Sequence, residues 1–284
     1  MKKFTVMAVA LLLPLMVWGQ AQIDTKKMKI SDFTEKITKV VLTGNQFHDA
    51  CIKSEVTSKW HVSPFEFCTM SEFEKLKSDE NYYFLLTTKG QFKKETEPGL
   101  TFLTLVKGGV DNEKGIDSML EIVAFPYASA EEPSGREVVF LPAFLDIIQN
   151  YALDSMAKDV NGYLGLPNYS MNISRSGEMA LVFSETDLSS EITPEIKEKY
   201  FDDAVSVLEE ESADAYLTPD KAGVLVSYVA APTSAKPGSY CYKMLIDPQT
   251  NKLYYFRKHK ISKKFGPGFL AEDIKRITAP RVKQ

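Results

Sequence analysis

The same order of strand-like and helix-like segments occurs twice along the chain, and this order most restricts its fold. Residues 59–86 and residues 199–226 align without a gap over 28 positions. Only two of these positions are identical, so the match is one of apolar pattern. Strands that alternate with helices are typical of mixed α/β folds. We therefore predict a mixed α/β (α+β) protein with two pseudo-repeated strand–helix–strand–helix–strand–strand halves.

Apolar alternation and helical spacing predict the elements of the first half. A Ser-x-x-Glu capping box from Ser71 to Glu74 predicts the start of a short helix. The polar loop 91–99 lies between two β-rich runs and predicts a hairpin. In the helix predicted at 45–60 we expect a core face made of Phe47, Cys51, Ile52, Val56 and Trp60. Strands are predicted at 37–44, 63–69, 81–90, 100–109 and 120–128, and a second long helix at 140–159.

The second half repeats this order. Strands are predicted at 179–186, 204–208 and 222–232, and two more within 240–260. Thr193 and Pro194 predict the start of a helix over 193–201. The acidic segment 209–221 predicts a turn or helix, and 268–277 a closing helix.

The N-terminus has the layout of a secretory signal peptide. Two lysines precede an apolar run of 15 residues, Phe4 to Trp18, and small residues follow. This layout predicts a signal peptide over residues 1–21, cleaved after Gly19 or Ala21. The alternative is a membrane anchor, but the run is shorter than the roughly 20 residues that span a bilayer. We expect an exported protein, periplasmic or secreted, without a transmembrane segment in the mature chain.

Length and charge limit the organisation of the mature chain. We expect a linker over 22–36, a first α/β half over 37–160 and a second over 161–284. Whether the halves form one domain or two is left open. The apolar share of 44% and the charged share of 25% are ordinary for a globular protein. The net charge of −4 argues against a nucleic-acid partner.

Charge is unevenly distributed within the second half. Residues 185–220 contain twelve acidic and two basic residues, whereas 252–284 contain ten basic and two acidic residues. Such asymmetry can indicate a partner surface. The alternative is that both kinds of charge are solvated or neutralise each other.

Three cysteines remain in a compartment where disulfides can form. Cys51 and Cys68 can pair if a helix lies against the next strand, which leaves Cys241 free. The alternative is that all three are small buried apolar side chains. The absence of a Cys-x-x-Cys motif disfavours thiol–disulfide exchange as the function.

The sequence contains no recognisable catalytic or metal-binding motif, so we predict no catalytic residue, no metal and no cofactor. His48 and Cys51 share a helix face, but Cys51 also lies on the expected core face, where a thiol is inert. His61 and Cys68 are seven positions apart with nothing to fix their geometry. The spacings of zinc sites, calcium loops and phosphate-binding loops are absent. Two carboxylates that meet in a cleft stay possible from sequence alone.

The segment 254–264 interleaves aromatic with basic residues. Such segments bind anionic polymers, and the candidate binding residues are Arg257, Lys258, Lys260, Lys263 and Lys264. The alternative is an edge strand whose lysines prevent edge-to-edge pairing.

The signal sequence ending in "WGQAQ" and the run "KWHVSPFEF…FEKLKSDENYYFLL" resemble an uncharacterised family of exported proteins of Bacteroidetes-type bacteria. The resemblance implies export but brings no reaction and no catalytic residues. We expect a non-enzymatic binding or interaction module of the bacterial cell envelope, with an anionic envelope polymer or another envelope protein as partner. The alternatives are a metal-independent hydrolase with its site between the two halves, and a structural component of an envelope assembly.

Overall fold

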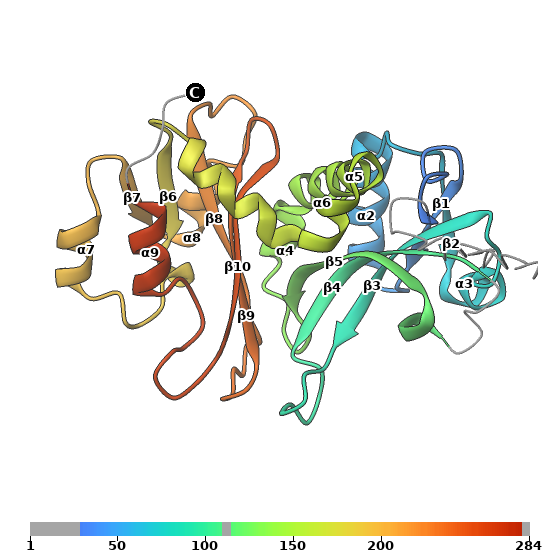
Figure 1. Ribbon diagram of the computed structural model, residues 1–284. Coiled ribbons are helices and arrows are strands. Elements are labelled where there is room, and N and C mark those ends of the chain that lie inside the picture. The colour runs from blue at the N-terminus through green and yellow to red at the C-terminus, as the bar shows by residue number, and fades with distance from the viewer. Residues whose placement is uncertain (1–28, 110–114, 280–284) are drawn as a thin grey trace, which may run out of the picture.

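A computed structural model describes residues 29–109 and 115–279 (Figure 1). It contains two five-stranded mixed sheets with helices packed on them, which confirms the predicted mixed α/β class. The predicted signal peptide and its cleavage positions lie outside the described residues. No helix in the described part of the chain is long and apolar enough to cross a membrane.

The first sheet has the strand order β2-β1-β3-β4-β5. Strand β1 lies between β2 and β3 and is parallel to both, and the pairs β3/β4 and β4/β5 are antiparallel. Parallel neighbours need a crossover, which helix α2 supplies between β1 and β2, whereas antiparallel neighbours need only a turn. The bounds are β1 Ile37–Leu42, α2 Gln46–Lys59, β2 Phe65–Thr69, β3 Tyr82–Gly90, β4 Leu100–Lys107 and β5 Leu120–Ser129.

The second sheet repeats this arrangement, in the order β7-β6-β8-β9-β10. Strand β6 is parallel to β7 and β8, and β8/β9 and β9/β10 are antiparallel. The two halves are similar in their strand order, in agreement with the sequence pattern. Strands β2 and β7, which occupy equivalent edges of the two sheets, pair with β1 and β6 in different registers. The bounds are β6 Ala180–Ser184, β7 Val205–Leu208, β8 Val224–Ala230, β9 Tyr240–Asp247 and β10 Lys252–Lys260.

Each sheet has one face covered by its own longer helices. Helices α2 and α5 (Leu141–Ala157) cover one face of the first sheet, and the short α3 (Met70–Leu76) packs near β1 and β2. Helices α7 (Pro194–Tyr200) and α9 (Ala271–Ile277) lie on the outer face of the second sheet, whose inner face points to the first half (Figure 1).

The two halves share a core. One cluster of buried residues contains Phe125 and Phe144 of the first half together with Tyr228, Met244 and Phe256 of the second. Ile30 and Phe33 are fully buried in the same cluster, although they precede β1 in the segment expected to be a linker. This continuous apolar contact fixes the second sheet beside the first.

Two local predictions were wrong. Phe47 is 69% exposed, because the buried stripe of α2 consists of Ile52, Val56 and the capping residue Trp60, four residues apart, and Phe47 is off that stripe. The capping box is formed by Thr69 and Glu72 instead of Ser71 and Glu74. Helix α3 begins at Met70, so its first backbone N–H groups meet these two side chains.

The irregular segments were not predicted from periodicity. They are η2 (Ile116–Ser118), α4 (Arg136–Val139), α6 (Asp159–Leu164), the 3₁₀ segment η3 (Leu166–Arg175), η4 (Glu185–Asp187) and α8 (Glu210–Asp214), of which only α8 falls in a predicted turn or helix. Most of them connect or border the two halves, where the structure forms its cavities.

Candidate functional site

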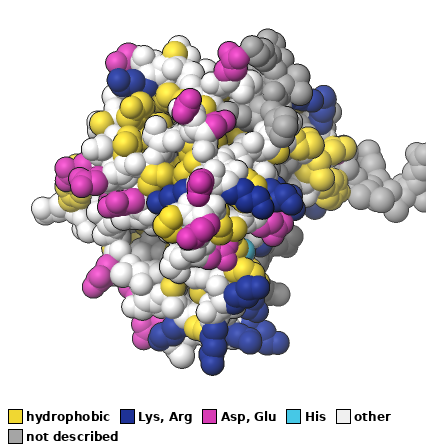
Figure 2. Space-filling model, turned by 90° about the vertical axis from the view of Figure 1, so that its left-hand side faces the viewer, with side chains coloured by type: hydrophobic (Ala, Val, Ile, Leu, Met, Phe, Trp, Pro, Cys, Tyr) yellow, Lys and Arg dark blue, Asp and Glu magenta, His cyan; other side chains and the backbone are white. Residues whose placement is uncertain are grey.

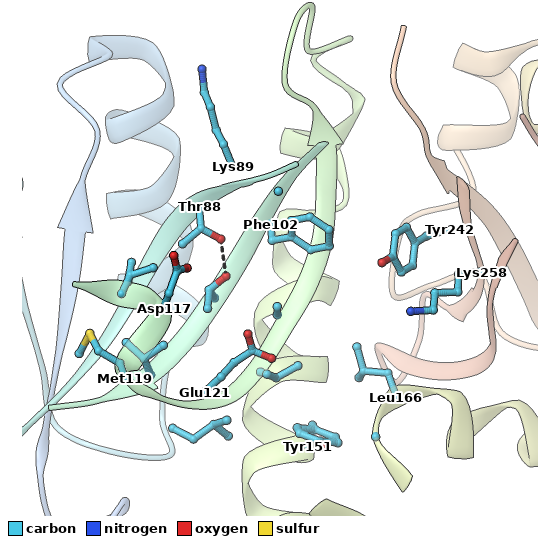
Figure 3. Close-up of a pocket in the computed structure, with 18 of the residues that line it drawn as sticks. Thr88, Lys89, Phe102, Asp117, Met119, Glu121, Tyr151, Leu166, Tyr242 and Lys258 are labelled. Atoms are coloured by element: carbon cyan, nitrogen blue, oxygen red, sulfur yellow. Dashed lines mark hydrogen bonds between the residues drawn. The ribbon is translucent and has the colours of Figure 1, made fainter. Parts of the chain in front are cut away.

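A cavity of about 660 Å³ lies between the two halves (Figure 3). Strands β3, β4 and β5 form its floor, and β9, β10 and the start of η3 form the facing wall. Its volume is in the range of small-molecule sites. Its lining includes Thr88, Gly90, Phe102, Thr104, Asp117, Glu121, Ala124, Tyr242, Phe256 and Lys258.

The alternation of side chains along β4 explains why the floor is open. Leu103 and Leu105 are buried in the shared core, and Phe102, which belongs to the same core, lines the cavity together with Thr104 and Val106. Successive side chains of a strand point to opposite faces of the sheet. Helix α3 packs on β1 and β2, and its Phe73 shares a buried cluster with Val106 at one end of β4, while Phe102 and Thr104 of β4 line the cavity. The second half closes that space.

Aromatic rings form the contact between floor and wall. The Phe102 and Tyr242 rings meet edge to face at 5.8 Å, and Tyr242 lies 5.9 Å from Phe256. Gly90 makes room for this contact, since a Cβ atom on it would lie 2.5 Å from the Phe102 ring. Both rings are 8% exposed, so each presents a small apolar edge to the cavity.

A few polar groups face the same space. The hydroxyls of Thr88 and Thr104 are hydrogen-bonded at 2.7 Å. Glu121 points into the cavity from the floor, and Lys258 from the facing wall (Figure 3). Burial raises the pKa of Tyr242 to about 12, and the nearby Tyr240, Glu121 and Glu95 add to the rise. Tyr242 is therefore neutral at physiological pH.

The predicted basic residues do not form one surface. Lys258 lines the cavity, and Lys260, two residues on along β10, is exposed. Arg257 points to the opposite face, where its guanidinium pairs with Glu272 at 3.2 Å and Asp273 at 3.4 Å. Lys263 and Lys264 are exposed in the loop after β10.

The surface of the second half mixes its charges. On the face that carries α7 and α9, acidic and basic side chains lie among apolar and neutral ones (Figure 2). This agrees better with solvated charges than with one large acidic or basic surface.

All three cysteines are free thiols, without a bond between Cys51 and Cys68. Cys68 packs with Phe73 and Phe84 on the α3 side of the first sheet, whereas Cys51 lies on α2, on the opposite side. The sheet therefore separates the two sulfur atoms. Burial raises the pKa of Cys68 to about 11 and that of Cys241 to about 12, so both thiols stay protonated.

The histidines lie away from the cavity lining. His48 Nδ1 is buried without a hydrogen-bond partner, so it does not bond to the Cys51 thiol, and its ring meets Tyr127 at 5.8 Å. His259 Nε2 lies 2.8 Å from the carbonyl oxygen of Gly266. His61 donates its backbone N–H to Gln149 at 2.7 Å. Neither His48 with Cys51 nor His61 with Cys68, the two pairs disfavoured from the sequence, is joined by a hydrogen bond in the structure.

A buried charge cluster at the junction was missed from the sequence. Arg136 of α4 is 6% exposed and donates to Asp187 at 2.8 Å, to Asp214 at 2.9 Å and to the backbone oxygen of Ser227 at 3.0 Å. Burial opposes its charge, yet the two carboxylates outweigh burial and raise its pKa. The sequence indicated this cluster only through the excess of acidic residues over 185–220. Acidic side chains of this segment that become buried need basic partners from another part of the chain.

Within residues 29–109 and 115–279, no group of three or more His, Cys, Asp and Glu side chains is placed to hold a metal ion. Comparison of the chain with protein-family models, curated proteins and solved structures found no match. The cavity between the two halves is thus the candidate site on the strength of its own geometry.

Proposed function

We propose that the protein is an exported, non-enzymatic binding module of the bacterial envelope that takes an anionic amphiphile into the cavity between its halves. The observation that carries the proposal is the cavity itself, about 660 Å³ in volume and built by both halves. Its aromatic and aliphatic lining favours an apolar ligand body, because burial of apolar surface drives binding. Export is inferred from the layout of residues 1–21.

The charge of the ligand is inferred from the wall. Lys258 points into the cavity, so an acidic group of the ligand has a cation at the wall. Glu121 is exposed on the opposite side of the cavity and disfavours a second acidic group there. A ligand with an apolar body and one acidic end places its negative charge near Lys258 and its uncharged part near Glu121.

Anilinonaphthalene sulfonate, an aromatic amphiphile with one sulfonate, is a suitable probe. We expect saturable fluorescence enhancement with the folded protein. Ala124→Trp fills the floor of the cavity and should abolish the enhancement. Lys258→Glu should weaken binding by about tenfold, since it exchanges an attraction for a repulsion of order 1 kcal/mol.

Lys260→Glu is the matched control, because Lys260 is on the same strand but does not line the cavity. It should change the affinity by less than about twofold. Equal binding by the native protein and Ala124→Trp would refute the cavity as the site. A loss caused by Lys263→Glu/Lys264→Glu but not by Lys258→Glu would move the binding surface to the loop after β10.

The hydrolase alternative has one observation in its favour, since Asp117 and Glu121 both line the cavity. A pair of carboxylates can serve as acid and base in glycoside hydrolysis. Turnover of nitrophenyl glycosides that is lost in both Asp117→Asn and Glu121→Gln, with probe binding retained, would favour the hydrolase over the binding module.

A further inference from the structure

A second cavity, of about 400 Å³, lies away from the first, between α5, η3 and the turn that joins β9 to β10. Its lining differs in kind, because planar polar side chains and tyrosine rings dominate. They are Asn150, Asp154, Tyr169, Asn172, Arg175, Asn251 and Tyr254, with Ile147, Lys252 and Leu253 completing the lining.

Three of these polar side chains are held in place by bonds that use only part of their hydrogen-bonding capacity. The Asn172 amide nitrogen donates to the backbone oxygen of Leu253 at 2.9 Å. The Asn251 amide nitrogen donates to Asp146 at 2.7 Å, and Asp154 accepts from the Tyr169 hydroxyl at 2.6 Å. Each amide keeps a carbonyl oxygen that can accept, and Asp154 keeps a second carboxylate oxygen.

The donors of the cavity lie at its exposed side. Arg175 and Asn150 are both exposed and offer guanidinium and amide N–H groups. Acceptors that are fixed by the fold thus face donors that are accessible from solvent. Groups held in place before binding lose less conformational entropy when a ligand arrives.

This combination matches the chemistry of a sugar. Neighbouring hydroxyls of a sugar ring each donate and accept hydrogen bonds, which suits planar amide, carboxylate and guanidinium groups. The C–H face of the ring is apolar and can lie against the Tyr254 or Tyr169 ring. The lining contains one carboxylate, that of Asp154, and two cations, Arg175 and Lys252. The carboxylate offsets part of the positive charge, so the ligand does not have to be strongly acidic.

We propose that this second cavity is a saccharide-binding site. Asn172, Asn251 and Asp154 accept from the sugar hydroxyls, Arg175 and Asn150 donate to them, and a tyrosine ring covers the apolar face. The site is independent of the amphiphile cavity and of its proposed ligand.

The test is a titration of the full chain, followed by amide NMR, with glucose, galactose, mannose, N-acetylglucosamine and glucuronate. We expect at least one of these sugars to shift the resonances of Asn172 and Asn251. Arg175→Ala and Asn150→Ala should each weaken that binding by about tenfold, the loss of roughly one hydrogen bond to a charged or polar group. Both side chains are exposed, so the fold should not depend on them.

Two control variants separate this proposal from the proposed function. Lys275→Ala, exposed on α9, and Ala124→Trp in the first cavity should leave sugar binding unchanged. The saccharide site would be overturned if none of the five sugars shifted the Asn172 and Asn251 resonances. Equal sugar affinity in Arg175→Ala and the native protein would overturn it as well. Loss of the anilinonaphthalene signal in Ala124→Trp with sugar binding intact would keep the two sites distinct.

Discussion

Several charged side chains of this protein are buried in its interior. Lys243 of β9 is 1% exposed and forms an ion pair with Asp273, which is fully buried. Asp273 also accepts from the Tyr255 hydroxyl at 2.7 Å and from the backbone N–H of Leu270 at 2.9 Å. Such a cluster ties the closing helix α9 to its sheet through hydrogen bonds that an apolar pair cannot make.

His259 lies near this cluster and gives stability a pH dependence. Burial lowers its pKa below the ordinary 6.5, and the Lys243 charge acts in the same direction against the weaker effects of Gly266, Asp273 and Glu191. The folded protein then binds fewer protons than the unfolded chain as pH falls below about 6.5. The His259 contribution is complete above that pH and is lost as pH falls through the lowered pKa.

We expect the free energy of unfolding, measured by urea titration, to decrease as pH falls from 7 to 5, with His259 a contributor. His259→Gln should show a smaller decrease over the same range, because its side chain does not titrate. An unchanged pH profile in the variant would contradict the assignment. Burial opposes the charge of Asp273, but the Lys243 charge holds the pKa of this carboxyl below the ordinary 3.8. Asp273 therefore titrates below the pH range of this experiment.

At the scale of elements, the short helix α4 is anchored by a charge rather than by an apolar face. Arg136 reaches from α4 to Asp187 of η4 and Asp214 of α8, so three segments without strong periodicity meet at one guanidinium. The guanidinium carbon of Arg136 also lies 5.1 Å from the centroid of the Phe140 ring. Removal of one partner of a buried ion pair leaves uncompensated charge in the interior.

Arg136→Met should therefore lower the free energy of unfolding by about 3–5 kcal/mol. The control is Arg276→Met, since Arg276 forms an exposed pair with Glu272, and exposed pairs contribute less than about 1 kcal/mol. Urea denaturation measures both. Equal small losses in the two variants would show that the cluster does not anchor α4.

The regular elements could be predicted from the sequence because their signals are local. Alternation in 81–90 and 100–109 predicted the β3/β4 hairpin, and helical spacing predicted α5. The position of Phe47 could not be predicted, because which apolar residue of a helix is buried depends on its neighbours in space. Irregular segments such as α4 and η3 have no period to detect.

The candidate sites depend on the packing of distant segments and were largely hidden in the sequence. Of the five predicted basic residues, only Lys258 lines the main cavity. Phe102 and Tyr242 look like ordinary strand residues until the two sheets bring their rings together. The second cavity combines Asn150 with Asn251, a hundred residues apart, and no spacing rule links them.

At the scale of the whole molecule, the shared core joins the two halves into one cooperative unit. Phe125 and Phe144 of the first half contact Phe256 and Tyr228 of the second, respectively. The Tyr228 hydroxyl donates to the backbone oxygen of Tyr127 at 2.5 Å. Separation of the halves would expose these rings to water.

We expect a single unfolding transition. Trp60 is 2% exposed and lies in the first half, so its fluorescence reports that half, whereas far-ultraviolet circular dichroism reports both. The two urea midpoints should coincide, as a two-state transition requires. Separate midpoints would indicate two independent domains and a cavity wall that can move without unfolding.

A crystal structure with bound anilinonaphthalene sulfonate would show whether the space between the halves is a binding cavity. We expect the aromatic body to lie against the Phe102 and Tyr242 rings, which contact each other at 5.8 Å, with the sulfonate at Lys258. A probe bound elsewhere, or a cavity that stays empty at saturating probe concentration, would contradict this expectation.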